Sequence, residues 1–108
     1  MSVGNLLKST TTVTAAQDAA TISGLPSVGS VGIQVTGTFV ATITFEATVD
    51  GTNYVALNCL PSNSATTAST VAVAGAFTVS SGGYAAVRAR CSAYTSGSPV
   101  LTVRYVGS

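Results

Sequence analysis

Four basic and three acidic side chains are the charged groups with which this 108-residue chain could do chemistry. There is no histidine, so the usual general base near neutral pH is missing, as is every Ser-His or Cys-His pair. Glu46 and Asp50 are four residues apart, which along an extended strand separates them by roughly 13 Å. Glycosidases need about 5 to 9.5 Å between their two carboxyl groups. Unless the intervening turn folds back, this pair cannot act as one, and we expect no catalytic residues and no enzyme.

Metal ligands are equally scarce. Cys59 and Cys91 cannot complete a tetrahedral zinc shell without histidine. The run from Asp50 to Asn53 could be part of a calcium loop, but acidic residues at alternating positions are missing. Asp-Gly is instead the dipeptide of a two-residue hairpin turn, which we expect here. We therefore expect no metal and no cofactor. The cysteines are either two buried thiols or one bridge between neighbouring strands.

Three arginines and two tyrosines form the candidate interface of the chain: Arg88, Arg90, Arg104, Tyr84 and Tyr94. The arginines share an outward register on strands that we expect to be neighbours, and the tyrosines flank the first two. Arginine and tyrosine are enriched among the residues that dominate binding energy at protein interfaces. The alternative is a solvated outer face on which Glu46 pairs with one arginine.

The elements that must position these side chains read as β-strands. Residues 38–49 give the clearest pattern, with apolar side chains at six alternate positions from Phe39 to Val49. Alternation or short β-rich runs also mark residues 10–23, 30–36, 53–60, 71–79, 84–94 and 99–106. No segment has a helical period. We predict an all-β fold, a single antiparallel β-sandwich, jelly-roll or Ig-like, of about seven to eight strands with essentially no helix.

The length suits one domain. We place the β-sandwich domain at residues 10–108 and expect residues 1–9 to form an N-terminal arm. Such an arm is a candidate for lying across a neighbouring subunit and adding a strand to the edge of its sheet.

The surface implied by this composition is unusual. Only 6% of residues are charged, against about 25% in typical soluble domains, and the mean hydropathy is +0.53. Charge is the main device by which β-proteins avoid edge-to-edge pairing and aggregation. We therefore expect the chain to function in an assembly that covers its faces.

Two classes of partner are disfavoured. The net charge is +1 and the pI about 7.8, whereas nucleic-acid-binding domains carry a clustered basic patch and a pI above about 9. The longest apolar run, Val71 to Phe77, is far short of the roughly 20 residues of a membrane-spanning helix. The N-terminal residues lack the pattern of a secretory signal. We expect neither a nucleic-acid nor a membrane partner.

Two stretches carry a resemblance. GIQVTGTFVATITFEATVDGTNYVALN (Gly32 to Asn58) and GGYAAVRARCSAYTSGSPVLTVR (Gly82 to Arg104) resemble a recurrent small module of tailed bacteriophages and prophages. The resemblance implies a non-enzymatic β-sandwich on heads, necks or fibres of virions, with no catalytic residues to transfer. One departure is Tyr54, where tryptophan is common in the module, and it weakens any expectation that this position stacks on a sugar.

The functional hypothesis is a virion structural protein, specifically a capsid decoration or cement protein that stabilises the phage head. Its partners would be the major capsid protein or other virion proteins, and copies of itself in a homo-oligomer, for which a trimer is favoured. It would be located in the virion, assembled in the cytoplasm of the host bacterium. One alternative is a recognition module of a fibre or appendage that binds a host glycan. Another is a neck or tail component.

Overall fold

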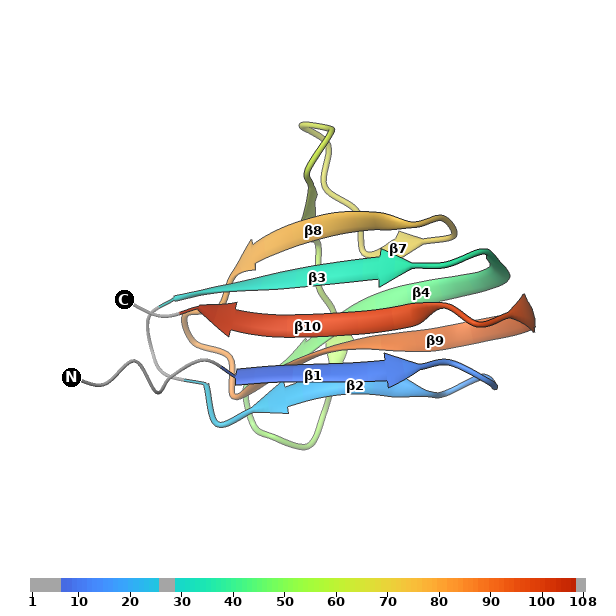
Figure 1. Cartoon of the computed structure of the whole chain (residues 1–108). Coiled ribbons are helices and arrows are strands. Elements are labelled where there is room, and N and C mark those ends of the chain that lie inside the picture. Colours follow the sequence, from blue (N-terminus) through green and yellow to red (C-terminus); the bar gives the residue numbers. More distant parts are fainter. Residues whose placement is uncertain (1–6, 26–28, 107–108) are drawn as a thin grey trace.

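The protein is a β-sandwich in a computed structural model that describes residues 7–25 and 29–106 (Figure 1). Sheet A contains, in spatial order, β1 (Leu7–Thr12), β10 (Val100–Val106), β3 (Ser30–Thr36), β8 (Gly75–Ser80) and β6 (Leu60–Pro61). Sheet B contains β2 (Ala19–Ser23), β9 (Ala86–Gly97), β4 (Phe39–Thr48) and β5 (Val55–Ala56), with β7 (Thr70–Val71) also pairing with β4. All pairings are antiparallel, and none of the described residues forms a helix, which confirms the predicted fold class.

Strands that follow each other in sequence nearly always belong to opposite sheets. Of the connections between consecutive strands, only the one from β4 to β5 stays within a sheet. Sequence neighbours such as β9 and β10 are therefore not neighbours in a sheet, although their turn signals are those of hairpins. This alternation between sheets decides which side chains share a face of the molecule.

The alternating pattern places the core as predicted from Ala41 to Ala47, but Val49, the last of the six alternate positions, lies beyond the end of β4 and is 71% exposed. Ile43 and Phe45 of β4 are fully buried, and so is Leu101 of β10. The rings of Phe45 and Phe77 bridge the two sheets, with centroids 4.8 Å apart. Each inward-facing apolar side chain of this kind contributes about 1.5–3 kcal/mol through burial. The core therefore lies between the sheets along their whole length.

Three expected boundaries differ from the structure. β1 begins at Leu7, inside the segment assigned to the arm, because residues 7–12 pair with β10 in continuous register; residues 1–6 of that arm lie outside the described residues. The expected return strand at 53–60 is reduced to β5 and β6, since the chain leaves sheet B after Ala56 and crosses to sheet A. The Asp-Gly turn is a longer loop in which only Gly51 has a positive φ.

The segment between β6 and β7 projects as a finger at the top of Figure 1, beyond the edge of sheet A. Cys59 and Cys91 are buried free thiols, which settles the alternative between thiols and a bridge in favour of thiols. Among the described residues, no helix is long and apolar enough to cross a membrane.

Candidate functional site

Arg88 and Arg90 lie close together on β9, and Glu46 of β4 binds both of them. Glu46 lies directly opposite Arg88 in the β4–β9 register, and Arg90 is the next outward-facing residue along β9. Glu46 Oε1 accepts from Arg88 Nε at 2.7 Å and from Arg90 Nε at 3.0 Å, while Oε2 accepts from Arg90 Nη2 at 2.9 Å. One carboxylate therefore pairs with both arginines rather than with one.

Further contacts hold both guanidinium groups in place. The ring of Tyr54 stacks on Arg88, whose Cζ is 3.8 Å from the ring centroid. Arg90 Nη1 donates to Gln17 Oε1 at 2.8 Å. Hydrogen bonds from Arg90 and Arg88 keep the pKa of Glu46 below its ordinary value against the opposing effect of burial, and Glu46 raises the pKa of Arg90. The cluster is a clamp between β4 and β9 in which one carboxylate binds two guanidinium groups, so that it keeps one net positive charge.

Tyr94 is on the opposite face of sheet B from the one predicted. The β4–β9 pairing skips Ser92, so that Thr42 lies opposite Ala93 and Ala41 opposite Tyr94. This β-bulge reverses the alternation beyond Cys91, as one extra residue in a strand must. Tyr94 consequently packs against the core, and its hydroxyl donates to the Gly97 carbonyl oxygen at 2.7 Å.

The ring of Tyr84 does not lie beside the arginines on the outer face either. It precedes β9, in the turn from β8, where its N–H donates to the Ser81 carbonyl oxygen at 3.2 Å. Its side chain is half-buried and packs against the core cluster. Neither predicted tyrosine flanks the arginines on the outer face. The aromatic that does so is Tyr54, which follows the loop after β4.

Arg104 is separated from the other two arginines. It lies on β10, in sheet A, and its side chain is on the outer face of that sheet, directly opposite Lys8 on one side and Gly32 on the other. The prediction that the three arginines lie on adjacent strands is wrong because the chain changes sheets between β9 and β10. Lys8 was missed because residues 1–9 were taken for an arm, although Lys8 and Thr10 already alternate with Leu7 and Ser9.

The remaining carboxylates are used in local turns. Asp50 Oδ1 accepts from the N–H groups of Thr52 and Asn53 at 2.8 Å each, and from Thr48 Oγ1 at 3.0 Å. Asp18 Oδ2 accepts from the N–H of Thr14 at 2.9 Å. These hydrogen bonds lower the pKa of both carboxyl groups. Within the described residues, no group of three or more His, Cys, Asp or Glu side chains is arranged to hold a metal ion.

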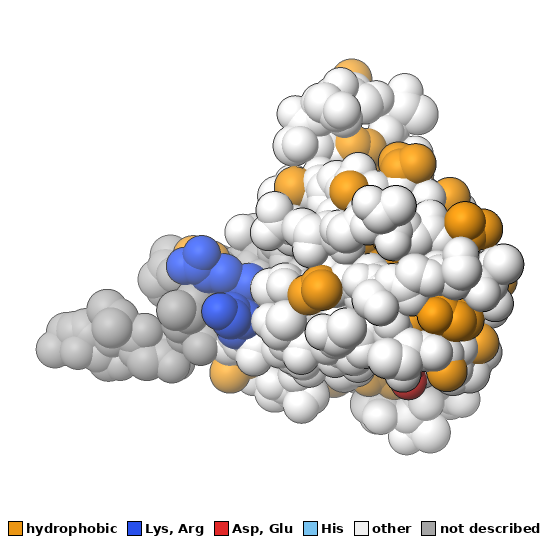
Figure 2. All heavy atoms as spheres, turned by 45° about the vertical axis from the view of Figure 1, so that its right-hand side comes forward, with side chains coloured by type: hydrophobic (Ala, Val, Ile, Leu, Met, Phe, Trp, Pro, Cys, Tyr) orange, Lys and Arg blue, Asp and Glu red, His pale blue; other side chains and the backbone are white. Residues whose placement is uncertain are grey.

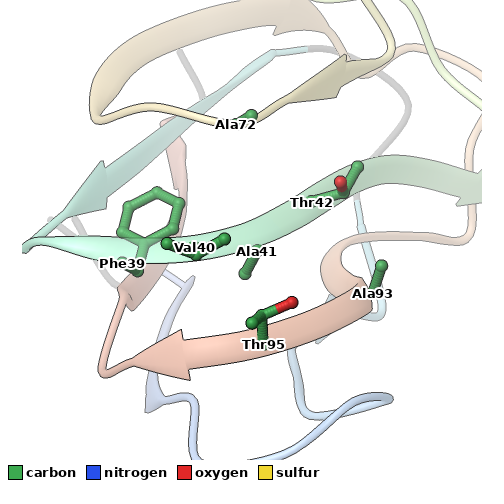
Figure 3. Close-up of a pocket in the computed structure, with 7 residues that line it drawn as sticks. All are labelled: Phe39, Val40, Ala41, Thr42, Ala72, Ala93 and Thr95. Carbon is green, nitrogen blue, oxygen red and sulfur yellow. The ribbon is translucent and has the colours of Figure 1, made fainter.

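An apolar surface lies at the end of the sandwich where β4 begins. A shallow hollow of about 400 Å³ is formed there by Phe39, Val40, Ala41, Thr42, Ala72, Ala93 and Thr95 (Figure 3). We call it the apolar hollow. Val40 beside it has 59% of its surface exposed, and Val73, next to Ala72, has 67%. In Figure 2, hydrophobic side chains are scattered over one end of the visible face, while the Lys and Arg side chains gather at the other.

Two solved structures share this fold. The SPBc2 prophage-derived protein YomS aligns with a TM-score of 0.73 and 12% identity, over 97% of this chain and 98% of YomS. The PBSX exported protein XepA aligns with a TM-score of 0.76 and 17% identity, over 99% of this chain and 40% of XepA. Both are phage-derived proteins, and at these identities the likeness establishes the fold. No protein-family model and no curated protein sequence matches the chain.

Proposed function

We propose that this chain is a non-enzymatic structural protein of a bacteriophage virion, and specifically a decoration protein that stabilises the head. The observation that carries the proposal is the scarcity of charged side chains on the surface. Only 6% of the residues are charged, Glu46 pairs with both Arg88 and Arg90 within the chain, and the apolar hollow with Val40 and Val73 faces solvent. A surface with so little repulsive charge is suited to burial in a lattice. The fold shared with the prophage-derived YomS supports a phage origin.

The stabilisation would come from burial of area and from main-chain pairing at sheet edges. A standard interface covers about 800 Å² on each partner. The chain has an accessible surface of 5587 Å², so contacts with capsid subunits and with other copies of itself can coexist. β1 and β2 are the edge strands of sheets A and B on the same side of the sandwich, and they offer backbone groups for such pairing.

The glycan-binding alternative finds less support in the site. Sugar-binding platforms stack rings on exposed aromatic faces, and Tyr54 is the aromatic on the outer face of sheet B. One face of its ring is already covered by Arg88. A neck or tail role needs the same kind of surface as a head role and differs in copy number.

Quantitative mass spectrometry of purified virions tests the proposal, using the phage whose genome encodes this chain. A decoration protein is expected at a copy number comparable to that of the major capsid protein, and cryo-electron microscopy should place it on the head. A few copies located at the neck, tail or fibre would favour the alternatives. Absence from purified particles would contradict a virion role altogether.

A further inference from the structure

Lys8 and Arg104 form a pair of like charges on the outer face of sheet A. They lie directly opposite each other on β1 and β10, and both are exposed. Residues opposite each other in an antiparallel pair have Cβ atoms about 5 Å apart, and like charges there are destabilising. The chain has only four basic residues, so half of them are concentrated at this one position.

None of the three acidic side chains is placed to neutralise this pair. Glu46 is bound to Arg88 and Arg90 on the outer face of the other sheet. The other two acids, Asp18 and Asp50, accept hydrogen bonds within their own turns. Within the described part of the chain, neither Lys8 nor Arg104 makes a salt bridge or a side-chain hydrogen bond. Among the described residues no acidic group therefore offsets these two charges, and an anion on a partner could do so.

A hollow lies beside Arg104 on the same face. Gly32 is directly opposite Arg104 on β3 and has no side chain, and the nearest atom to a Cβ placed there would be 4.0 Å away. The next outward-facing row across the sheet places Thr102 opposite Gln34 and Gln34 opposite Ala76. The resulting depression has a volume of about 290 Å³. Gly32 and Ala76 are among the residues that line it, together with the guanidinium of Arg104, an amide and two threonine hydroxyls.

We propose that this depression, with Lys8 and Arg104 at its side, is a docking site for carboxylate side chains on the surface of an acidic partner protein. Arginine binds carboxylates with two parallel hydrogen bonds, and Lys8 adds a second charge within reach of the same group. Gln34 and Thr102 supply further donors. Given the function proposed above, on which this inference rests, the outer face of sheet A is the face turned toward the capsid.

The number of cations favours a protein partner. Nucleic acids and anionic membranes are bound through rows or clusters of many basic residues. Here two cations stand beside a depression large enough for one or two side chains. One partner with one or two acidic side chains matches both the charge and the size of the site.

The experiment titrates an octaglutamate peptide into the ¹⁵N-labelled full chain and follows amide shifts by NMR. Shifts are expected at Lys8, Gly32 and Arg104. The double variant Lys8→Gln/Arg104→Gln should weaken binding roughly tenfold, since it removes two charge-assisted contacts. The matched control Thr21→Glu/Ser23→Glu lowers the net charge equally on the outer face of sheet B and should leave these shifts in place. Shifts that are absent, or spread evenly over the surface, would overturn the inference.

Two further measurements separate the possible outcomes. Inorganic phosphate and phosphatidylglycerol vesicles are titrated in parallel, and tighter binding of either at Lys8 and Arg104 would overturn the assignment to protein carboxylates. Purified phage shells are then incubated with the same variants. Equal binding of the wild type and Lys8→Gln/Arg104→Gln would overturn the inference while leaving the decoration role intact. Failure of the wild-type chain to bind shells, with peptide binding retained, would instead contradict the decoration role.

Discussion

Arg90 binds Glu46 with two parallel hydrogen bonds from one edge of its guanidinium group, with Nε 3.0 Å from Oε1 and Nη2 2.9 Å from Oε2. The two residues come from β9 and β4, the longest strands of sheet B. The side chains are only 22% and 11% exposed, so the pair is partly protected from solvent screening. Such two-point contacts are the stronger kind of ion pair. The central strand pair of sheet B is therefore clamped from its outer face.

The first prediction concerns this clamp. Glu46→Gln should destabilise the fold by about 1–3 kcal/mol, because Arg88 and Arg90 would lose the negative charge and one of the two acceptor oxygens that they share, while remaining partly buried. Urea denaturation followed by tyrosine fluorescence measures the change. Arg104→Gln is the matched control, since Arg104 has no acidic partner and faces Lys8. It should change stability by less than about 0.5 kcal/mol. Equal effects of the two variants would contradict a structural role for the clamp.

The second prediction is that the fold loses stability in acid, while its stability does not change near neutral pH. The folded state holds the pKa of Glu46 below its ordinary value of 4.5, and it lowers the pKa of Asp18 and Asp50 as well. A lowered pKa contributes stability that is fully present above the ordinary value and is lost as the pH falls through the folded value. No histidine titrates in between. The melting temperature should thus be level from pH 5 to 8 and decline below about pH 4.5.

Glu46→Gln provides the control for that profile. It removes one of the three groups responsible, so its melting temperature should fall less steeply with acid than that of the wild type. A decline of the same steepness would mean that Glu46 is not among the groups whose protonation destabilises the fold.

The sequence predicted those features of the fold that local periodicity records. The alternation around Phe45 identified β4 and its buried face, because a strand with one face in the core must place apolar residues at every second position. The boundaries of β3 at Ser30 and Thr36 were predicted correctly for the same reason. Sheet membership is not a local property. The separation of Arg104 from Arg88 follows from the chain crossing between sheets at Pro99, and no periodicity records that.

The candidate site was predicted in part. The pairing of Glu46 with an arginine was one of the two alternatives, and it follows from the outward register of both residues. Tyr94 was assigned to the outer face because the bulge at Ser92 leaves no clear mark in the sequence. Tyr54 was not among the predicted site residues, because its contact with Arg88 depends on how the loop after β4 folds back.

The third prediction separates steric overlap from backbone strain at two glycines. Gly97 and Gly83 have almost the same φ, +91° and +93°. A Cβ on Gly97 would lie 2.5 Å from Phe39 Cα and from Thr38 O, whereas a Cβ on Gly83 would meet nothing within 4 Å. Gly83→Ala should cost about 1–2 kcal/mol from the φ alone. Gly97→Ala should cost a further 1–3 kcal/mol, because backbone atoms cannot move aside easily.

Denaturant unfolding of both alanine variants checks this difference. If Gly97→Ala proves no more destabilising than Gly83→Ala, then β9 and β4 do not approach each other at Gly97 as closely as the structure has it.

The fourth prediction concerns the thiols. Burial raises the pKa of Cys59 to about 12 and also raises the pKa of Cys91. The thiolate is the reactive form, so both cysteines should react with Ellman's reagent at pH 8 roughly 100-fold or more slowly in the native protein than in urea. Rapid reaction of one thiol in the native protein would indicate local opening of its strand. Failure of both to react in urea would indicate a disulfide.

The last prediction concerns self-association, for which a trimer is favoured. Val40 lies near the start of β4 and Val49 directly follows its last residue. They are 59% and 71% exposed, but only Val40 lines the apolar hollow. Light scattering over a concentration series should give the native mass of a trimer or a larger closed oligomer. If copies associate through the hollow, Val40→Lys should raise the dissociation constant at least about tenfold, because an apolar contact worth about 1.5–3 kcal/mol is replaced by a charge.

Val49→Lys adds the same charge and removes the same side chain at the other end of the strand, so it should leave the native mass unchanged. If both variants dissociate the oligomer equally, added charge rather than the position of the contact controls association. A wild-type chain that stays monomeric at high concentration would show that its charge-poor surface can face water without being covered by another subunit. Self-association would then be discarded, and the apolar hollow would be left as a contact surface for a different protein.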